Sequence, residues 1–173
     1  MYIYSLNFKV RDYECDLQGI VNNANYQHYT EHTRHEFLRS RGVSFAELHE
    51  RGIDAVVAGM QMRFKTPLRS GDEFVSKLGL KKEGIKYVFV QDLYRLPDMR
   101  PVFKSTVEAV CLVNGRLSQC PELDLIVPDP HVTTPAKEGR GGGAHRTRPP
   151  GGGVWGGGGG GAWGEEGGGG GGG

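Results

Sequence analysis

The strongest helical signal in this chain lies between Ala24 and Arg41, a stretch of eighteen residues without proline or glycine. Four residues within it fall on one face at helical spacing, and these are Tyr26, Tyr29, Thr33 and Phe37. Gly42 follows directly as a stop signal. The sequence therefore predicts one long helix with an apolar face, which has to be covered by another layer of structure.

A second, shorter helix is predicted after the first. Ser44 stands at its N-cap and Glu47 follows three residues later, which is the pattern of a capping box. Val43 and Leu48 occupy the positions of a hydrophobic staple. Gly52 ends this helix, and after it the periodicity changes from helical to strand-like.

Five stretches are rich in β-branched and aromatic residues and are predicted to be strands. They are Ile3–Arg11, Ile53–Lys65, Glu73–Lys81, Lys86–Leu96 and Val102–Val113. The connectors between the last four are short and contain proline, glycine or aspartate, which predicts antiparallel neighbours. The predicted fold class is α+β, with an antiparallel five-stranded sheet wrapped around one long central helix.

The last part of the chain has a different composition. Of the 29 glycines, 21 lie from Gly139 onward, and no apolar periodicity runs between them. Pro128, Pro130 and Pro135 precede this stretch and interrupt regular structure. The sequence predicts one domain over residues 1–127 and a disordered tail rich in proline and glycine over residues 128–173.

Composition and charge exclude several classes of function. The formal net charge is +1 and the charged residues alternate in sign, so no nucleic-acid partner is expected. No stretch is long and apolar enough for a membrane span, and the first residues lack the pattern of a signal peptide. The three cysteines have no metal-binding spacing and fit a reducing compartment. We expect a soluble cytoplasmic protein, or one of the plastid stroma if the source is a plant or an alga.

The segment between Tyr13 and Tyr26 combines a carboxylate, a turn and the start of the long helix. Asp16 precedes Gly19, which allows a sharp turn, and Asn22 and Asn23 follow as residues that favour helix caps. The first amides of a helix lack intrahelical partners, so they can bind a carbonyl oxygen on which negative charge develops. Asp16 would then attack the carbonyl carbon or direct water to it, and the pattern favours acyl-transfer chemistry.

The order of a strand, an Asp-x-x-Gly turn, a long helix and four antiparallel strands resembles the hotdog fold. Asp16–Val21 with Asn25-Tyr26 is similar to the turn and the following dipeptide of the 4-hydroxybenzoyl-CoA thioesterase-like family. Phe64–Asp72 is similar to the second recurrent segment of that family. Residues 22–26 and 34–38 further resemble its acyl-CoA and acyl-carrier-protein thioesterases, including those of plant plastids. The resemblance covers residues 4 to about 127.

This resemblance implies an enzyme of fatty acid metabolism that hydrolyses acyl-CoA or acyl-carrier-protein thioesters to a free acid and a thiol, without a cofactor. It implies that Asp16 is the nucleophile or the general base. It also implies that the backbone N–H of Asn23 polarises the thioester carbonyl and that Gly19 completes the turn. A homodimer or homotetramer is implied as well, with sheets paired edge to edge and Asp16 of one chain facing Ala58–Gln61 of its partner.

Further residues are candidate contacts to the substrate. These are Val21, Asn22, Tyr26, Lys65 and Arg69. The two cations suit the phosphates of CoA or phosphopantetheine, although a solvated turn beside Gly71 explains them equally well. Tyr26 fits a core position on the helix as well as an acyl-binding one. Glu14, two residues before Asp16, is a second carboxylate that would share proton transfer if it faced the same way.

Other interpretations stay open at this point. Asp16 also fits a purely local role as the cap of a turn or helix, which would leave a non-catalytic acyl-thioester-binding protein. A hotdog dehydratase would place a catalytic histidine before the helix, and no histidine precedes His28. The pattern His28-x-x-Glu31-His32, followed by His35, is that of an inverted zinc protease. That pattern is short and lacks an identifiable distal carboxylate ligand, so no metal is expected.

Overall fold

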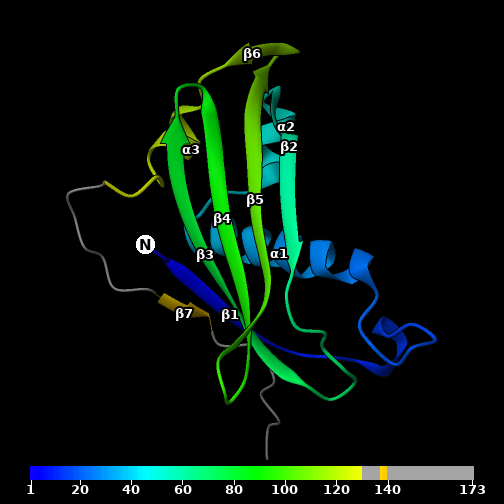
Figure 1. Cartoon of the computed structure of the whole chain (residues 1–173). Helices are drawn as coiled ribbons and strands as arrows, with labels where there is room; N and C mark the ends of the chain where they lie inside the picture. The colour runs from blue at the N-terminus through cyan, green and yellow to red at the C-terminus, as the bar shows by residue number, and fades with distance from the viewer. Residues whose placement is uncertain (130–136, 140–173) are drawn as a thin grey trace, which may run out of the picture. The chain divides into compact units, whose positions relative to one another are not determined.

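The computed structural model describes residues 1–129 and 137–139. The chain divides into two units, Met1–Gly142 and Gly143–Gly173, and the elements described below belong to the first. In chain order they are β1 (Tyr4–Lys9), the 3-10 helix η1 (Asp12–Glu14), α1 (Asn23–Ser40), α2 (Phe45–Glu50), β2 (Ile53–Phe64), β3 (Glu73–Glu83), β4 (Lys86–Arg95), β5 (Arg100–Val113), β6 (Arg116–Ser118), α3 (Pro121–Asp124) and β7 (Lys137–Gly139) (Figure 1). None of the helices in these ranges has the length and apolar character needed to cross a membrane.

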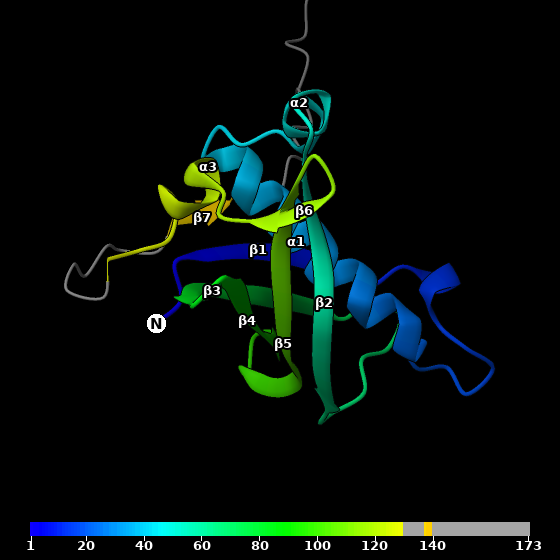
Figure 2. The same ribbon diagram turned by 90° about the horizontal axis from the view of Figure 1, so that it is seen from above.

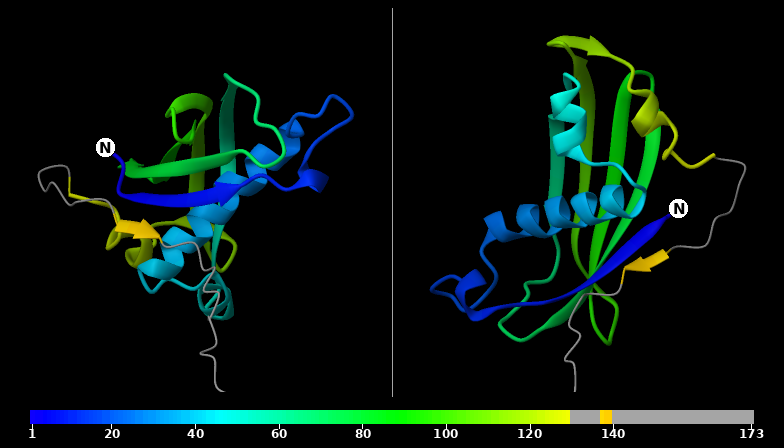
Figure 3. Two further views of the ribbon diagram at one scale, coloured as in Figure 1. Left: turned by 90° about the horizontal axis from the view of Figure 1, so that it is seen from below. Right: turned by 180° about the vertical axis from the view of Figure 1, so that it is seen from behind.

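All five predicted strands are present in one sheet. Their order is β2-β5-β4-β3-β1, with β7 beside β1 and the short β6 paired with β5. Paired strands are antiparallel, except that β7 runs parallel to β1. The sheet curls around α1, as the view from above shows (Figure 2). The views from below and behind show α1 lying along its concave side (Figure 3). The predicted α+β architecture is confirmed.

Two short strands were not predicted. β6 returns on β5 through Asn114 and Gly115, which have φ values of +50° and +77°. β7 lies beyond the predicted domain boundary at Val127. Residues 130–136 and 140–173 lie outside the described part of the chain, so the predicted disorder of residues 128–173 stays a prediction.

Local capping defines where the helices begin. The Asn22 side chain accepts a hydrogen bond from the Ala24 amide at 3.0 Å, which caps α1. The Ser44 hydroxyl accepts one from the Glu47 amide at 3.4 Å, as predicted for the start of α2. The buried face of α1 consists of Tyr26, Tyr29, Thr30, Thr33, Phe37 and Leu38. This face contains all four residues that the helical spacing had placed together.

Two apolar clusters fill the space between α1 and the sheet. One surrounds the later part of α1 and includes Phe37, Leu78, Phe89 and Val107. The other surrounds the start of α1 and includes Tyr26, Tyr29, Phe74, Leu93 and Phe103. The core is therefore divided along the length of the helix.

A layer of buried polar side chains separates these clusters. Ser76, Gln91 and Ser105 each stand between residues of the two clusters along β3, β4 and β5. The Gln91 side-chain amide donates a hydrogen bond to the Thr30 carbonyl oxygen at 2.9 Å. The Thr33 hydroxyl donates one to the Ser76 hydroxyl, also at 2.9 Å. A shift of α1 along the sheet would leave these buried groups unpaired, so the layer fixes the position of the helix.

Phe37→Ala is expected to lower the free energy of unfolding by about 3–5 kcal/mol, because the buried ring would leave a cavity beside Tyr4. Leu125→Ala is the control, since this apolar side chain is 86% exposed and its loss should cost less than about 0.5 kcal/mol. Urea unfolding at a fixed protein concentration measures both. Equal losses for the two variants would contradict the placement of Phe37 in the core.

Candidate active site

The carboxylate of Asp16 lies in a tight turn between η1 and α1. The Gly19 amide donates a hydrogen bond to the Asp16 carbonyl oxygen at 3.0 Å, and Gly19 has a φ of +72°, a conformation that favours glycine. Pairing between Cys15 and Val21 holds the base of the loop. The Asp16 amide also donates to the Ile20 carbonyl oxygen at 2.9 Å. The backbone position of Asp16 is therefore well defined, although the loop is exposed.

One oxygen of the Asp16 side chain serves the turn. Oδ1 accepts hydrogen bonds from the amides of Gln18 at 2.8 Å and Ile20 at 3.4 Å. This is the local role that aspartate often has in turns. Oδ2 accepts no hydrogen bond from any residue that the structure describes. A chemical role remains compatible with the local one, because each uses a different oxygen.

One backbone amide at the start of α1 is left free. The Asn22 amide donates to the Glu14 carbonyl oxygen at 2.9 Å, and the Asn22 side chain accepts from the Ala24 amide. The Asn23 amide lies between the amides of Asn22 and Ala24 and has no acceptor within residues 1–129 and 137–139. Capping therefore leaves the Asn23 N–H available to an external acceptor.

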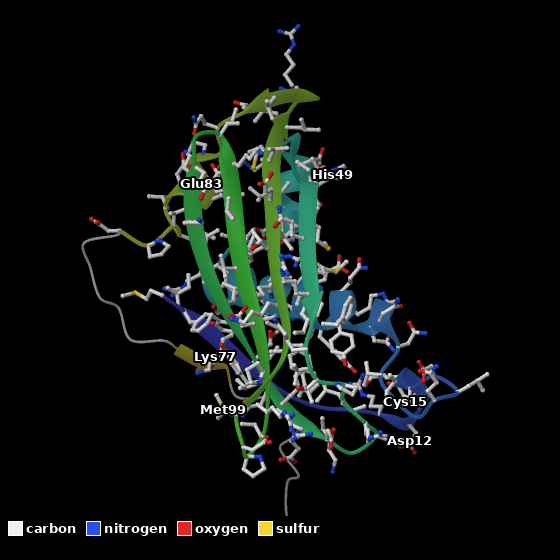
Figure 4. All side chains as sticks on the ribbon, in the orientation of Figure 1. Asp12, Cys15, His49, Lys77, Glu83 and Met99 are labelled. Carbon is white, nitrogen blue, oxygen red and sulfur yellow. The ribbon has the colours of Figure 1, made fainter. Side chains whose placement is uncertain are left out.

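The segment after β2 closes the other side of this region. The Val21 amide donates to the Leu68 carbonyl oxygen at 2.8 Å, and the Leu68 amide donates to the Tyr26 hydroxyl at 3.2 Å. The result is a hollow of about 450 Å³, which we call the Asp16 recess. Its lining consists of Asp16, Ile20, Val21, Asn22, Asn23, Tyr26, Phe64, Lys65, Thr66 and Pro67. Asp12 and Cys15 mark this corner in Figure 4.

The recess brings together six of the eight residues proposed from the sequence. They are Asp16, Val21, Asn22, Asn23, Tyr26 and Lys65. Gly19 and Arg69 are not part of the lining, but a Cβ atom on Gly19 would lie 3.9 Å from the Arg69 Nη1, so both adjoin the turn. Sequence reasoning did not name four of the lining residues as site residues: Ile20, Phe64, Thr66 and Pro67. The resemblance of Phe64–Asp72 to a recurrent segment was the signal that pointed to three of them.

Tyr26 belongs to the core as well as to the recess. It is 4% exposed, and its ring stacks on Phe103 with centroids 5.2 Å apart and meets Phe64 edge-on at 5.4 Å. Burial raises the pKa of its hydroxyl, although the hydrogen bond from the Leu68 amide acts in the opposite direction. The hydroxyl is therefore a neutral group that holds Leu68, while the ring packs in the core.

The histidine pattern on α1 forms no metal site in the described part of the chain. His28, Glu31 and His32 are exposed. The His32 ring meets the Phe8 ring at 5.9 Å, and the ring of His35 packs 5.4 Å from that of another phenylalanine, Phe45. No group of three or more His, Cys, Asp or Glu side chains among the described residues is placed to hold a metal ion. In the described residues, the spacing therefore corresponds to an exposed helix face.

A second cavity of about 520 Å³ lies between α1, α2 and the start of β2, and we call it the α2 cavity. Its lining is mainly apolar and includes Leu38, Phe45, Ile53, Ala55, Val57, Phe89, Val107, Ala109 and Leu123. Arg34 also lines it and donates a hydrogen bond to the Gln91 side-chain oxygen at 2.9 Å, while burial lowers the pKa of its guanidinium. His49, labelled in Figure 4, stands among its polar residues and contacts Asp54 at 2.6 Å. Sequence reasoning missed this cavity.

Comparison with known proteins identifies the family. Residues 10–128 match the thioesterase-like superfamily. This chain belongs to that superfamily. A chloroplastic acyl-acyl carrier protein thioesterase of Arabidopsis thaliana, ATL3, is 38% identical to it over 112 residues, which are 64% of this chain and 59% of that protein. The chain thus spans about three-fifths of the length of this relative.

Solved structures of similar proteins have the same fold. A hypothetical protein of Aquifex aeolicus superposes with a TM-score of 0.65 at 28% identity, over 70% of this chain and 96% of that one. A 1,4-dihydroxy-2-naphthoyl-CoA thioesterase of Synechocystis gives a TM-score of 0.66 at 13% identity, over 69% of this chain and 90% of that one. Together with the superfamily match, these likenesses confirm the hotdog fold.

Proposed function

We propose that this chain hydrolyses acyl thioesters to a free acid and a thiol, with acyl-CoA or an acyl carrier protein as the donor of the acyl group. The observation that carries this proposal is the free Asn23 amide, which lines the same recess as the Asp16 carboxylate. A thioester bound there would direct its carbonyl oxygen toward the positive end of α1 and its carbonyl carbon toward Asp16. The name of the Arabidopsis relative supports the same class of reaction.

Two routes use these groups. In the first, Asp16 Oδ2 attacks the carbonyl carbon, the C–S bond breaks with release of the thiolate, and water then cleaves the acyl-aspartyl anhydride to restore the carboxylate. In the second, Asp16 accepts a proton from water while the water oxygen attacks the carbonyl carbon, and the proton passes to the departing thiolate. In both, the Asn23 amide stabilises the oxyanion, and one such donor contributes about 2.7–4 kcal/mol to the transition state.

The remaining residues of the recess suit the two sides of a thioester. Val21, Tyr26 and Phe64 give an apolar wall for the acyl group. Lys65 lines the recess and Arg69 adjoins it, and neither side chain forms an ion pair with the described residues. These cations are placed to bind the phosphates of CoA or of phosphopantetheine.

Asp16→Asn is expected to lower kcat at least about 100-fold, because a positioned base or nucleophile supplies about 10²–10⁴-fold of rate. The amide oxygen can still accept the hydrogen bonds from Gln18 and Ile20, so the unfolding temperature should not change. Thiol release from a panel of acyl-CoA and acyl-carrier-protein substrates measures the loss and identifies the donor. Asp98→Asn, at an exposed carboxylate of the β4–β5 hairpin, is the control and should keep full activity.

Near-normal turnover by Asp16→Asn would contradict the role given to Asp16. Another outcome would favour the non-catalytic alternative, namely that the wild-type chain binds acyl thioesters in calorimetry but releases no thiol from any member of the panel.

The double variant Lys65→Ala with Arg69→Ala is expected to raise KM several-fold with little change in kcat, because the two charges act on phosphates away from the reacting carbonyl. The effect should shrink as salt is added, since salt screens exposed charges. Arg116→Ala is the control, at an exposed cation of the β5–β6 hairpin at the other end of the sheet (Figure 1). An unchanged KM at low salt would show that the two cations are solvated side chains of the turn and do not bind the substrate.

We also propose that two copies pair through β2. This strand is 12 residues long, and β5 is its one partner in the described sheet. Val56, Val57 and Phe64 along it are 39%, 53% and 52% exposed. A long strand with free backbone groups and exposed apolar side chains is a template for pairing with another strand.

Antiparallel pairing of two identical strands sets the N-terminal half of one against the C-terminal half of the other. The start of β2 lines the α2 cavity, and its end lines the Asp16 recess. Pairing would therefore bring the recess of one chain next to the α2 cavity of its partner, with Ala58–Gln61 between them. The apolar cavity has a volume typical of small-molecule sites and would receive the acyl chain.

A mixture of two inactive variants tests this shared site. Asp16→Asn removes the carboxylate but leaves the α2 cavity open, whereas Ala55→Trp fills the cavity and keeps the carboxylate. In a mixed dimer, one of the two sites combines the intact carboxylate with the open cavity. Co-expression should therefore restore thiol release from a long-chain acyl thioester to about a quarter of the wild-type rate. Absence of any recovery, or full activity of a diluted monomer, would contradict the proposal.

A further inference from the structure

Glu14 is a buried carboxylate beside the Asp16 recess that does not line it. The residue is 7% exposed. A buried charge is unfavourable unless hydrogen bonds compensate for the lost water, so its partners explain why it is tolerated. Those partners come from both sides of the turn that contains Asp16.

The Glu14 side chain connects η1 to the second turn of α1. Its Oε2 accepts one hydrogen bond from the Tyr29 hydroxyl at 2.7 Å and another from the Arg11 amide at 2.8 Å. Its Oε1 lies 3.5 Å from the Arg11 guanidinium. The Tyr29 ring is itself fixed, because it packs against Phe74 and Phe8 with centroids 4.8 and 5.5 Å apart.

The backbone of the same residue connects to the start of α1. The Glu14 carbonyl oxygen accepts hydrogen bonds from the Asn22 amide at 2.9 Å and from the Asn25 side-chain amide at 2.7 Å. Residue 14 therefore contacts the cap, the first turn and the second turn of the helix. Asp16 follows two residues later, so these contacts set where its turn stands relative to the Asn23 amide.

We propose that Glu14 is a positioning residue that holds the Asp16 turn in register with the Asn23 amide. This inference rests on the proposed thioesterase function. The contacts give no support to a share of Glu14 in proton transfer, because its side chain faces Tyr29 and Arg11 and lies outside the recess. A displacement of about 1 Å at a reacting group can cost about 100-fold in rate, so loosening this contact should lower kcat and leave KM nearly unchanged.

Three substitutions separate positioning from chemistry. Glu14→Ala removes the acceptor of the two hydrogen bonds, and Tyr29→Phe removes one donor while keeping the packed ring. Both are expected to lower kcat for thiol release by about 10-fold or more, with KM within about twofold of wild type. Glu14→Gln keeps an oxygen that can accept both hydrogen bonds, so it should retain activity within about threefold and an unchanged pH profile.

Two results would overturn the inference. Wild-type kcat in both Glu14→Ala and Tyr29→Phe would show that the contact does not position the turn. Loss of activity in Glu14→Gln equal to that of Asp16→Asn, with a changed acid limb of the pH profile, would show that Glu14 takes part in proton transfer.

Amide hydrogen exchange gives a readout that does not depend on activity. Glu14→Ala should speed exchange in residues 16–24, whereas Glu14→Gln should not. If the wild-type chain releases no thiol from any substrate, the proposed function fails, and exchange still decides whether Glu14 fixes the turn. Unchanged exchange in Glu14→Ala would then overturn the inference.

Discussion

The burial of one face of α1 against the concave sheet is the interaction on which the rest of this structure depends. Apolar packing holds the helix to the sheet, and the hydrogen bonds of the polar layer to Thr30 and Thr33 fix its position along the strands. Local capping sets the first residue of α1, and this packing fixes where that end of the helix lies in the domain. The packed core thus fixes the position of the Asn23 amide, and the contacts of the Asp16 turn then place the carboxylate beside it.

The polar layer also divides the concave face by function in the proposed reaction. On one side lie the aromatic cluster and the Asp16 recess, where the carbonyl chemistry would take place. On the other lie the larger apolar cluster and the α2 cavity, whose mainly apolar lining offers room for an apolar chain. Arg34 and Gln91 connect the polar layer to that cavity.

Sequence reasoning worked where the signal is local. The periodicity of α1, the caps at Asn22 and Ser44, and the turn at Gly19 each depend on residues close together in the chain, and the structure contains all of them. The role of the Asn23 amide was predicted from the family resemblance. Sequence spacing alone does not show that the amides on either side, those of Asn22 and Ala24, are bonded to Glu14 and Asn22. The α2 cavity left no local signal, since its lining comes from helices and strands far apart in the sequence. The histidine spacing predicted a shared helix face, and His28, Glu31 and His32 do lie on an exposed face of α1.

The geometry of one helix against a curled sheet also explains why β2 runs from the α2 cavity to the Asp16 recess. An α-helix with its side chains is about 10–12 Å wide, whereas five strands at about 4.8 Å spacing span roughly 20 Å. α1 packs mainly against β1 and β3, so the inner face near β2 and β5 is left partly uncovered. The α2 cavity and the exposed side chains of β2 are both consequences of this mismatch in width. A second copy paired through β2, as proposed above, would lie next to this uncovered half. In the proposed dimer, the uncovered half of one chain and the Asp16 recess of the other would therefore meet at β2.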